Sequence, residues 1–482
     1  MRLKFIKQVI FALGLGLCIN SHVFATDLLE VYYEALENDP TFKRAYSIFM
    51  AESTSIPQAL AALLPQLTTD ALIARTYTEV MAGPALDVNR TYSQNRLNVY
   101  ATQTLFNMKS WSLLEQARAN VRAALANFND SAQNLILRSA QAYFNVLLAQ
   151  DNLNTVKVQR QAYKRQLMQA QDRFNVGLDP VTTVYQAKAA YDQSQSTVIT
   201  AQNNLMDAQQ NLAKLTNHSY PAVAALKNKT LPLMRPEPFQ SESWINTSLK
   251  QNYKLYAAKY YLETARQNIK TQFSGHLPYF TLFGNFNEVN NLVSTANPNS
   301  TGTGPVNSLF NDIFVPQMTR NANTGVSVNL PLFQGGLVVA KTQEAEFKFQ
   351  DYSNQLEYIR REVVTNTQIT FNAITNGIAK VKADHQSLKS QKCSLDSIEQ
   401  QYQAGTKTIT DVLYAEQQYF QTQLQYTNDQ YSLITQLLQL KYLAGTLNVK
   451  DLEEINSWLD TSQINSLSPH SKQILHTILT NA

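Results

Sequence analysis

The sequence contains the same turn twice, and this repeat limits the possible fold more than any other feature. In both copies an aromatic residue stands three positions before a glycine, Phe174 before Gly177 and Tyr402 before Gly405. The glycines are 228 positions apart, and a helical pattern stops before each and resumes shortly after it. The chain is therefore internally duplicated, and each copy carries a helical hairpin that reverses at a glycine.

A seven-residue apolar repeat runs through the helix that precedes each turn. In the second copy it comprises Ile374, Val381, Leu388, Leu395 and Tyr402. In the first copy, at the same offset of 228, it comprises Val146, Leu153, Leu167 and Phe174, with Arg160 interrupting it. Roughly 65 residues from Lys109 to Asp172 without proline or glycine predict a helix of about 100 Å. Because one helix cannot bury its own apolar stripe, these helices require helical neighbours along their length.

Between the helical segments the pattern changes to alternation typical of β-strands. Residues 66–106 are rich in Thr, Tyr and Val and are divided by Gly83-Pro84, which predicts two long strands. The second copy predicts strands at Tyr279–Val293 and Thr324–Phe333. Strands of ten or more residues match the ~9–11 tilted residues that cross a bilayer.

The N-terminal 25 residues have the pattern of a secretory signal peptide. Arg2, Lys4 and Lys7 precede an apolar core from Val9 to Cys18, and Ala25 fits the cleavage position. The alternative, a membrane anchor, would need an apolar core of ~20 residues. No later stretch approaches 18 consecutive apolar residues, so any membrane crossing would use strands.

Composition argues against several classes of function. Charged residues make up 16% of the chain with a net charge of +4, and no clustered basic face predicts binding of nucleic acid. Cys393 is the one cysteine after the predicted leader, so no internal disulfide is expected. The six histidines have no metal-ligand spacing, and no nucleophile or phosphate-loop motif is present. We therefore expect no enzyme activity, no metal and no cofactor.

The strands also predict assembly. Each copy supplies two, so one chain supplies four, and an open sheet in lipid leaves edge groups unpaired at several kcal/mol each. The smallest membrane barrels have about eight strands. Two chains would supply eight strands and three would supply twelve, and the sequence count does not choose between them.

Six short motifs occur in the order and spacing of a known family. They are Leu64-Pro65-Gln66-Leu67, Ala142-Tyr143-Phe144-Asn145-Val146-Leu147, Arg173-Phe174-Asn175-Val176-Gly177-Leu178, Gly275-His276-Leu277-Pro278, Leu330-Pro331-Leu332-Phe333-Gln334-Gly335-Gly336, and Gly405-Thr406-Lys407-Thr408-Ile409 with Asp411-Val412-Leu413. Together with the duplication they resemble the TolC family of bacterial outer-membrane efflux ducts over nearly all residues after Ala25. The resemblance is closer to the TolC branch than to the lipid-anchored branch.

The resemblance implies mixed α and transmembrane β structure: a trimeric 12-stranded β-barrel, four strands per chain, continuous with a long α-helical coiled-coil barrel. It implies a location in the outer membrane of a Gram-negative bacterium, extending into the periplasm. The implied partners are two further copies of the chain, a periplasmic adaptor (membrane fusion) protein, an inner-membrane pump of RND, ABC or MFS type, and outer-membrane lipid.

The implied function is an exit duct of tripartite efflux or type I secretion systems, passing drugs or proteins and gated at the periplasmic helix tips. The alternative is a structural or adhesive coiled-coil protein of the cell surface with no channel. Such a protein would have no reason to carry paired strands at matching places in a duplicated chain.

The predicted organisation follows the repeat. In order it comprises a signal peptide at 1–25, a periplasmic helix at 26–64, barrel strands at 65–106, a long helical hairpin at 107–217, an equatorial linker at 218–241, a periplasmic helix at 242–275, barrel strands at 276–333, a long helical hairpin at 334–447 and an equatorial C-terminal tail at 448–482.

The resemblance also implies the residues that close the duct. Tyr402 and Lys407 match the constraint residues of the second tip, although the family's basic residue is usually Arg, whose planar fork fixes geometry better. Thr182 matches a threonine partner on the first tip, and Thr183 stands where the family has an aspartate. The hypothesis is that Asp172, in place of a glutamine, supplies a substitute carboxylate.

Two further groups of positions carry implied roles. Asp411 matches the first aspartate of a constricting ring and Tyr414 the position of the second, which predicts weaker ionic closure and a more aromatic constriction. Packing for Tyr402 and helix capping for Asp411 are the simpler interpretations of the residues alone. The predicted adaptor contacts at the tips are Val176, Gly177, Leu178, Ala404, Gly405 and Thr406.

Overall fold

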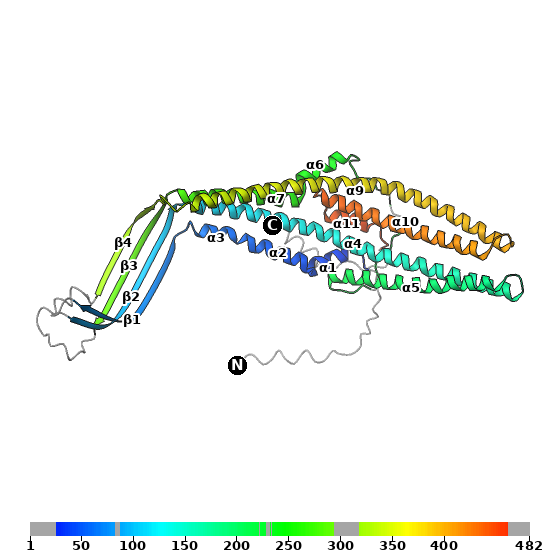
Figure 1. Cartoon of the computed structure of the whole chain (residues 1–482), viewed down its shortest axis with the longest axis horizontal. Coiled ribbons are helices and arrows are strands. Elements are labelled where there is room, and N and C mark those ends of the chain that lie inside the picture. Colours follow the sequence, from blue (N-terminus) through cyan, green and yellow to red (C-terminus); the bar gives the residue numbers. More distant parts are fainter. Residues whose placement is uncertain are drawn as a thin grey trace, which may run out of the picture. The chain divides into compact units, whose positions relative to one another are not determined.

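The computed structural model of the chain describes residues 26–81, 87–220, 222–227, 232, 234–293 and 318–460 (Figure 1). The predicted leader and residues from 461 onward lie outside the described residues. The chain divides into two compact units. One consists of Met1–Lys43, Ser131–Lys250 and Val364–Ala482, and the other of Arg44–Asp130 and Gln251–Val363. Both sequence copies contribute to both units, so the duplication does not divide the molecule into two independent halves.

The second unit contains one antiparallel sheet of four strands in the order β1-β2-β3-β4. The strands are β1 (Gln66–Met81), β2 (Asp87–Phe106), β3 (Tyr279–Val293) and β4 (Met318–Asn329). The expected strand at Thr324–Phe333 was therefore placed too late: β4 begins at Met318 and ends at Asn329. Pro331 follows closely, and proline has no N–H to donate to a sheet. The other strand predictions are confirmed.

The register of the sheet separates apolar from polar side chains. Val99 pairs with Phe286, and Phe286 pairs with Ala322, so these three side chains share one face. On the other face Asn98 Nδ2 donates to Asp70 at 2.8 Å, and Asn287 Nδ2 donates to Asn98. Alternation in the sequence has thus become a sheet with a mostly apolar and a mostly polar face, although the ion pair of Glu288 with Arg320 lies on the same face as Phe286.

Three shorter helices lie next to the strands in the sequence. They are α2 (Pro40–Ser53), α3 (Ser55–Ala61) and α7 (Tyr253–Phe273), the last followed by the 3₁₀ turn η1 (Ser274–His276). At Gly275 an added Cβ would lie only 2.9 Å from Val338 Cγ2. This close approach explains why glycine occupies the start of one family-like motif.

The first unit contains two long antiparallel hairpins, α4–α5 and α9–α10 (Figure 1). Its helices are α1 (Leu28–Asn38), α4 (Met108–Asn175), α5 (Val181–Thr216), α6 (Ser241–Gln251), α9 (Leu337–Gln403), α10 (Ile409–Leu443) and α11 (Val449–Asn456), of which α4 and α9 begin in the second unit. The predicted long helices of 68 and 67 residues are confirmed. Across the described part of the chain, no helix has the length and hydropathy needed to cross a membrane.

Most of the heptad positions are buried in the hairpins, as the repeat predicted, whereas Phe174 at the first tip is exposed. Ile374 and Val381 are buried in a cluster that includes Trp244 of α6 and Leu440 of α10. Val146, the equivalent of Ile374 in the first copy, is 1% exposed. Burial of such side chains stabilises the hairpins by about 1.5–3 kcal/mol each.

Candidate functional site

The two hairpin tips have the same backbone geometry. Gly177 and Gly405 both have φ +77°, a left-handed conformation that strains residues with a Cβ. Leu178 N donates to Arg173 O, and Thr406 N donates to Gln401 O, each at 2.9 Å. This six-residue hydrogen bond closes each helix in a Schellman motif. The prediction that each hairpin reverses at a glycine is confirmed.

Side chains from the first tip and from α9 meet in a network that we call the tip network: Arg173, Asp179 and Tyr402. Arg173 Nε donates to Asp179 Oδ2 at 2.9 Å, and its terminal nitrogen donates to Oδ1 at 3.3 Å. Tyr402 Oη donates to the same Oδ2 at 3.0 Å. The guanidinium carbon of Arg173 also lies 5.1 Å from the centre of the Tyr402 ring. The carboxylate of Asp179 therefore connects the turn of one hairpin to a helix of the other.

Apolar packing holds Tyr402 in this position. Its side chain is 4% exposed and contacts a cluster formed by Ala170 of α4, Ala187 of α5, and Ile409 and Val412 of α10. The ring of Tyr402 therefore packs on the heptad stripe, as the simpler interpretation predicted, and its hydroxyl forms a polar contact with Asp179.

The electrostatics keep the tip network in one protonation state. The hydrogen bond from Arg173 lowers the pKa of Asp179 below its ordinary value. Burial, and then the hydrogen bond to Asp179, raise the pKa of Tyr402 to about 12. At neutral pH the aspartate is therefore ionised and the tyrosine remains a donor.

The second tip forms its own, separate contacts. Thr408 Oγ1 and Asp411 form a capping box at the start of α10, with Asp411 Oδ2 accepting from Thr408 N at 2.9 Å. Lys407 Nζ lies 4.0 Å from Asp411 Oδ1, and both side chains are substantially exposed. The capping interpretation of Asp411 is confirmed, and these contacts with Thr408 lower the pKa of Asp411.

The remaining predicted gate residues lie nearby but outside the tip network. Thr182 and Asp172 are exposed, and Asp172 has no ion pair among the described residues of the chain. Thr183 is 8% exposed, and Tyr414 is 64% exposed on α10. The carboxylate that meets Tyr402 is Asp179 rather than Asp172. A second contact between the hairpins joins Thr410 Oγ1 to Gln186 Oε1 at 3.1 Å.

All six predicted adaptor-contact residues are exposed at the tips. Val176 and Leu178 present 71% and 66% of their surface, which is unusual for residues of this type. Gly177, Ala404, Gly405 and Thr406 are also exposed.

Asp179 was missed by sequence reasoning. The signal was available, because Asp179 stands two residues after Gly177 just as Lys407 stands two residues after Gly405. The resemblance points instead to Thr183, the family position of the aspartate, and to Asp172. The equivalent positions of the two copies indicate Asp179 directly.

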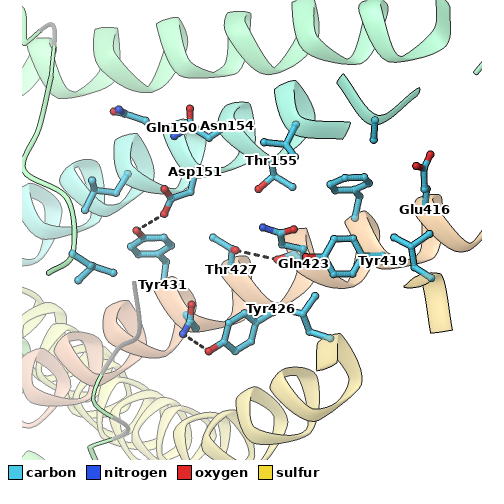
Figure 2. Close-up of a pocket in the computed structure, with 18 of the residues that line it drawn as sticks. Gln150, Asp151, Asn154, Thr155, Glu416, Tyr419, Gln423, Tyr426, Thr427 and Tyr431 are labelled. Carbon is cyan, nitrogen blue, oxygen red and sulfur yellow. Dashed lines mark hydrogen bonds between the residues drawn. The ribbon is translucent and has the colours of Figure 1, made fainter. Parts of the chain in front are cut away.

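Farther along the hairpins, away from the tips, a cavity of about 690 Å³ lies between α4, α9 and α10 (Figure 2). Tyr431 Oη donates to Asp151 at 2.8 Å across it, joining α10 to α4. Glu416 lies at one end of the cavity (Figure 2). The described residues include no group of His, Cys, Asp and Glu side chains arranged to hold a metal ion.

Comparison with known proteins agrees with this geometry. The sequence model of the outer membrane efflux protein family matches residues 31–218 and 244–446. The chain is 33% identical over 447 residues to the outer membrane protein TolC of Vibrio cholerae, covering 92% of this chain and 96% of that protein. It is 25% identical over 446 residues to the proteases secretion protein PrtF of Dickeya chrysanthemi, covering 91% and 92%.

The fold is also that of solved channels. The crystal structure of the outer membrane protein VceC from Vibrio cholerae aligns with a TM-score of 0.73 at 19% identity, covering 87% of this chain and 96% of that one. Paired long hairpins, a four-stranded amphipathic sheet and a polar contact between the tips define an outer-membrane exit duct. The chain belongs to the outer membrane efflux protein family.

Proposed function

We propose that three copies of the chain assemble into a duct whose twelve strands form one barrel and whose hairpins form a helical tunnel. The sheet supports this proposal through its edges and its faces. Each of β1 and β4 has one hydrogen-bonded neighbour among the described strands, so each leaves an edge for another chain. The apolar face with Val99 and Phe286 suits lipid, and the polar face with Asp70 and Asn98 suits an aqueous lumen.

The predicted domain assignment fits this arrangement. The barrel is formed by 65–106 and 276–333 and the tunnel by the hairpins at 107–217 and 334–447, while the linker 218–241 and the tail from 448 belong to an equatorial region.

The tip network is the observation that carries a gated mechanism. Asp179 belongs to the turn of α4–α5, and Tyr402 belongs to the α9–α10 hairpin, so their contact holds one hairpin against the other. Opening of the tunnel at this end requires α9–α10 to move away from α4–α5. The network must then break, while each hairpin keeps its own Schellman turn.

The constriction itself lies around Asp411 and Tyr414 in this proposal. One carboxylate at a threefold axis attracts cations less strongly than two would. We expect Tyr414→Asp to raise cation selectivity and sensitivity to block by multivalent cations in single-channel recordings. Unchanged selectivity would mean that Tyr414 does not line the constriction, and Tyr185→Asp, an equally exposed tyrosine of the other hairpin, is the matched control.

The exposed residues at the two tips support a proposal for the partner proteins. Exposed Val176 and Leu178, with the second tip from Ala404 to Thr406, form the contact for a periplasmic adaptor linked to an inner-membrane pump of RND, ABC or MFS type. Similarity to TolC and to a protease secretion protein supports passage of either small compounds or proteins, the choice residing in the pump. The duct breaks no bond in its cargo.

The decisive experiment combines native mass measurement of the detergent-extracted protein with conductance in planar bilayers. A trimer with small, cation-leaning conductance supports the gated duct. A monomer or filament without conductance would overturn the barrel and favour the coiled-coil surface protein.

A further inference from the structure

A carboxyl group is buried between α10 and α4, two helical turns from the tip network. Glu416 is 2% exposed, and Gln166 of α4 donates from Nε2 to its Oε1 at 3.2 Å. Glu416 Oε2 and Gln166 Oε1 are both buried and lack a hydrogen-bond partner. Two unpaired acceptors in one pair of side chains are costly when the carboxyl is ionised.

A single proton removes this cost. A neutral Glu416 gains an O–H donor, and the amide oxygen of Gln166 remains the acceptor within the same pair. An acid–amide pair of this kind can form two reciprocal hydrogen bonds, which here would join α10 to α4. The unpaired oxygens, Glu416 Oε2 and Gln166 Oε1, thus indicate that the packing of α10 against α4 is more stable when Glu416 is protonated.

The surroundings of Glu416 act in the same direction. Burial raises the pKa of Glu416 to about 7, and the negative charge of Glu399 on α9 adds to this, while Gln166 and Arg165 on α4 oppose it. Tyr163 is the other titratable group that faces it from α4, and Asp396 lies with Glu399 on α9 at the same cavity. From α5, Val184 and Ala187 lie in the adjacent apolar cluster.

We propose that protonated Glu416 and Gln166 hold α10 against α4, and that loss of this proton as pH rises makes the tips easier to open. The inference rests on the proposed function, because it takes separation of the hairpins as the opening step. Glu416 is a positioning residue: it acts on the gate through α10 and touches no cargo.

The direction of the pH effect follows from the raised pKa. In the open state Glu416 is solvated and has its ordinary pKa of 4.5. The contact between α10 and α4 in the closed state is therefore fully stable below pH 4.5 and loses stability as the pH rises to about 7. The difference between about 7 and 4.5, about 2.5 pKa units, corresponds to a roughly 300-fold change in the closed-to-open ratio for each chain. The tip network does not contribute, since the pKa of Asp179 is lowered and this carboxylate stays ionised throughout.

The test is conductance of the trimer in planar bilayers from pH 5 to pH 8.5. Wild-type channels should open tenfold or more often at the upper end, whereas Glu416→Gln channels should stay at the low-pH level throughout. Glu399→Gln is the matched control, because it removes a carboxylate from the same cavity. Opening of Glu399→Gln channels should still rise with pH, but the midpoint of the rise should lie at a lower pH than in wild type. A Glu416→Gln channel with the wild-type pH profile would overturn the inference.

Hydrogen exchange separates this inference from the proposed function. Wild type and Glu416→Gln are compared at the same pH. At pH 8 the backbone amides of residues 409–420 should exchange faster in wild type than in the variant, and at pH 5.5 they should exchange equally. This difference is expected whether or not the protein conducts. Equal protection at both values would overturn the proton-dependent contact, and absence of conductance or of a trimer would overturn the duct alone.

Discussion

The two hairpin tips are copies of one turn, yet they differ in what their side chains contact. Both end a long helix at a glycine with φ +77° and the same hydrogen bonds. Two residues beyond the glycine, the first tip has Asp179 and the second has Lys407. Asp179 reaches Tyr402 of the other hairpin, whereas Lys407 reaches Asp411 of its own hairpin among the described residues.

The aromatic residues before the two glycines differ in the same way. Phe174 is 42% exposed and has no hydroxyl, while its equivalent Tyr402 is 4% exposed and donates to Asp179. The difference teaches that glycine fixes the turn in both copies, and that one carboxylate and one hydroxyl convert two similar turns into a connected pair. The first tip supplies the acceptor, and the second hairpin supplies the donor.

Among substitutions at the two tips, Asp179→Asn should have the largest effect on channel opening. The change removes the ion pair with Arg173 and weakens the acceptor for Tyr402. After allowance for partial exposure this should cost about 1–2 kcal/mol, a roughly tenfold rise in channel opening. Single-channel recordings measure it, and the effect should be the same from pH 5 to pH 8, because the lowered pKa of Asp179 keeps the carboxylate ionised over this range.

The matched control for that variant is Asp172→Asn, seven residues earlier in the last turn of α4 and exposed. It should leave opening unchanged. A larger effect at Asp172 than at Asp179 would support the hypothesis that Asp172 is the substitute carboxylate and would contradict the role proposed for the tip network.

A smaller effect is expected from Tyr402→Phe. The ring keeps its packing against Ala170 and Val412, and only the hydrogen bond to Asp179 is lost. The expected cost is about 1 kcal/mol, or a roughly fivefold rise in opening. Tyr185→Phe, a tyrosine that is 65% exposed on α5, should have no effect. If Tyr402→Phe is equally silent, packing alone holds the hairpins together.

The smallest effect should come from Lys407→Ala. Its contact with Asp411 spans 4.0 Å, lies within one hairpin and is open to solvent, so opening should rise by less than about twofold. Conductance at two ionic strengths measures this. A rise above that of Asp179→Asn would show that Lys407 contacts a neighbouring chain, and it would reverse the ranking of the two tips.

Much of the fold was predictable because its causes are local. The seven-residue repeat placed Ile374 and Val381 in the core, alternation placed Val99 and Asn98 on opposite faces of the sheet, and the two glycines ended the helices. The boundaries of β4 were predicted wrongly, since the run from Leu330 to Phe333 continues the alternating pattern beyond the point where pairing stops, and Pro331 within that run was the signal against a strand.

By itself, the sequence determined the duplication, the long helices, the paired strands and the positions of both tips, because each depends on spacing along one segment. Only the tertiary structure decided that Asp179 rather than Asp172 meets Tyr402, and that Glu416 is buried against Gln166. These contacts join helices far apart in the sequence. Their geometry depends on how the helices pack, and no periodicity within one helix encodes which side chain of its neighbour it will meet.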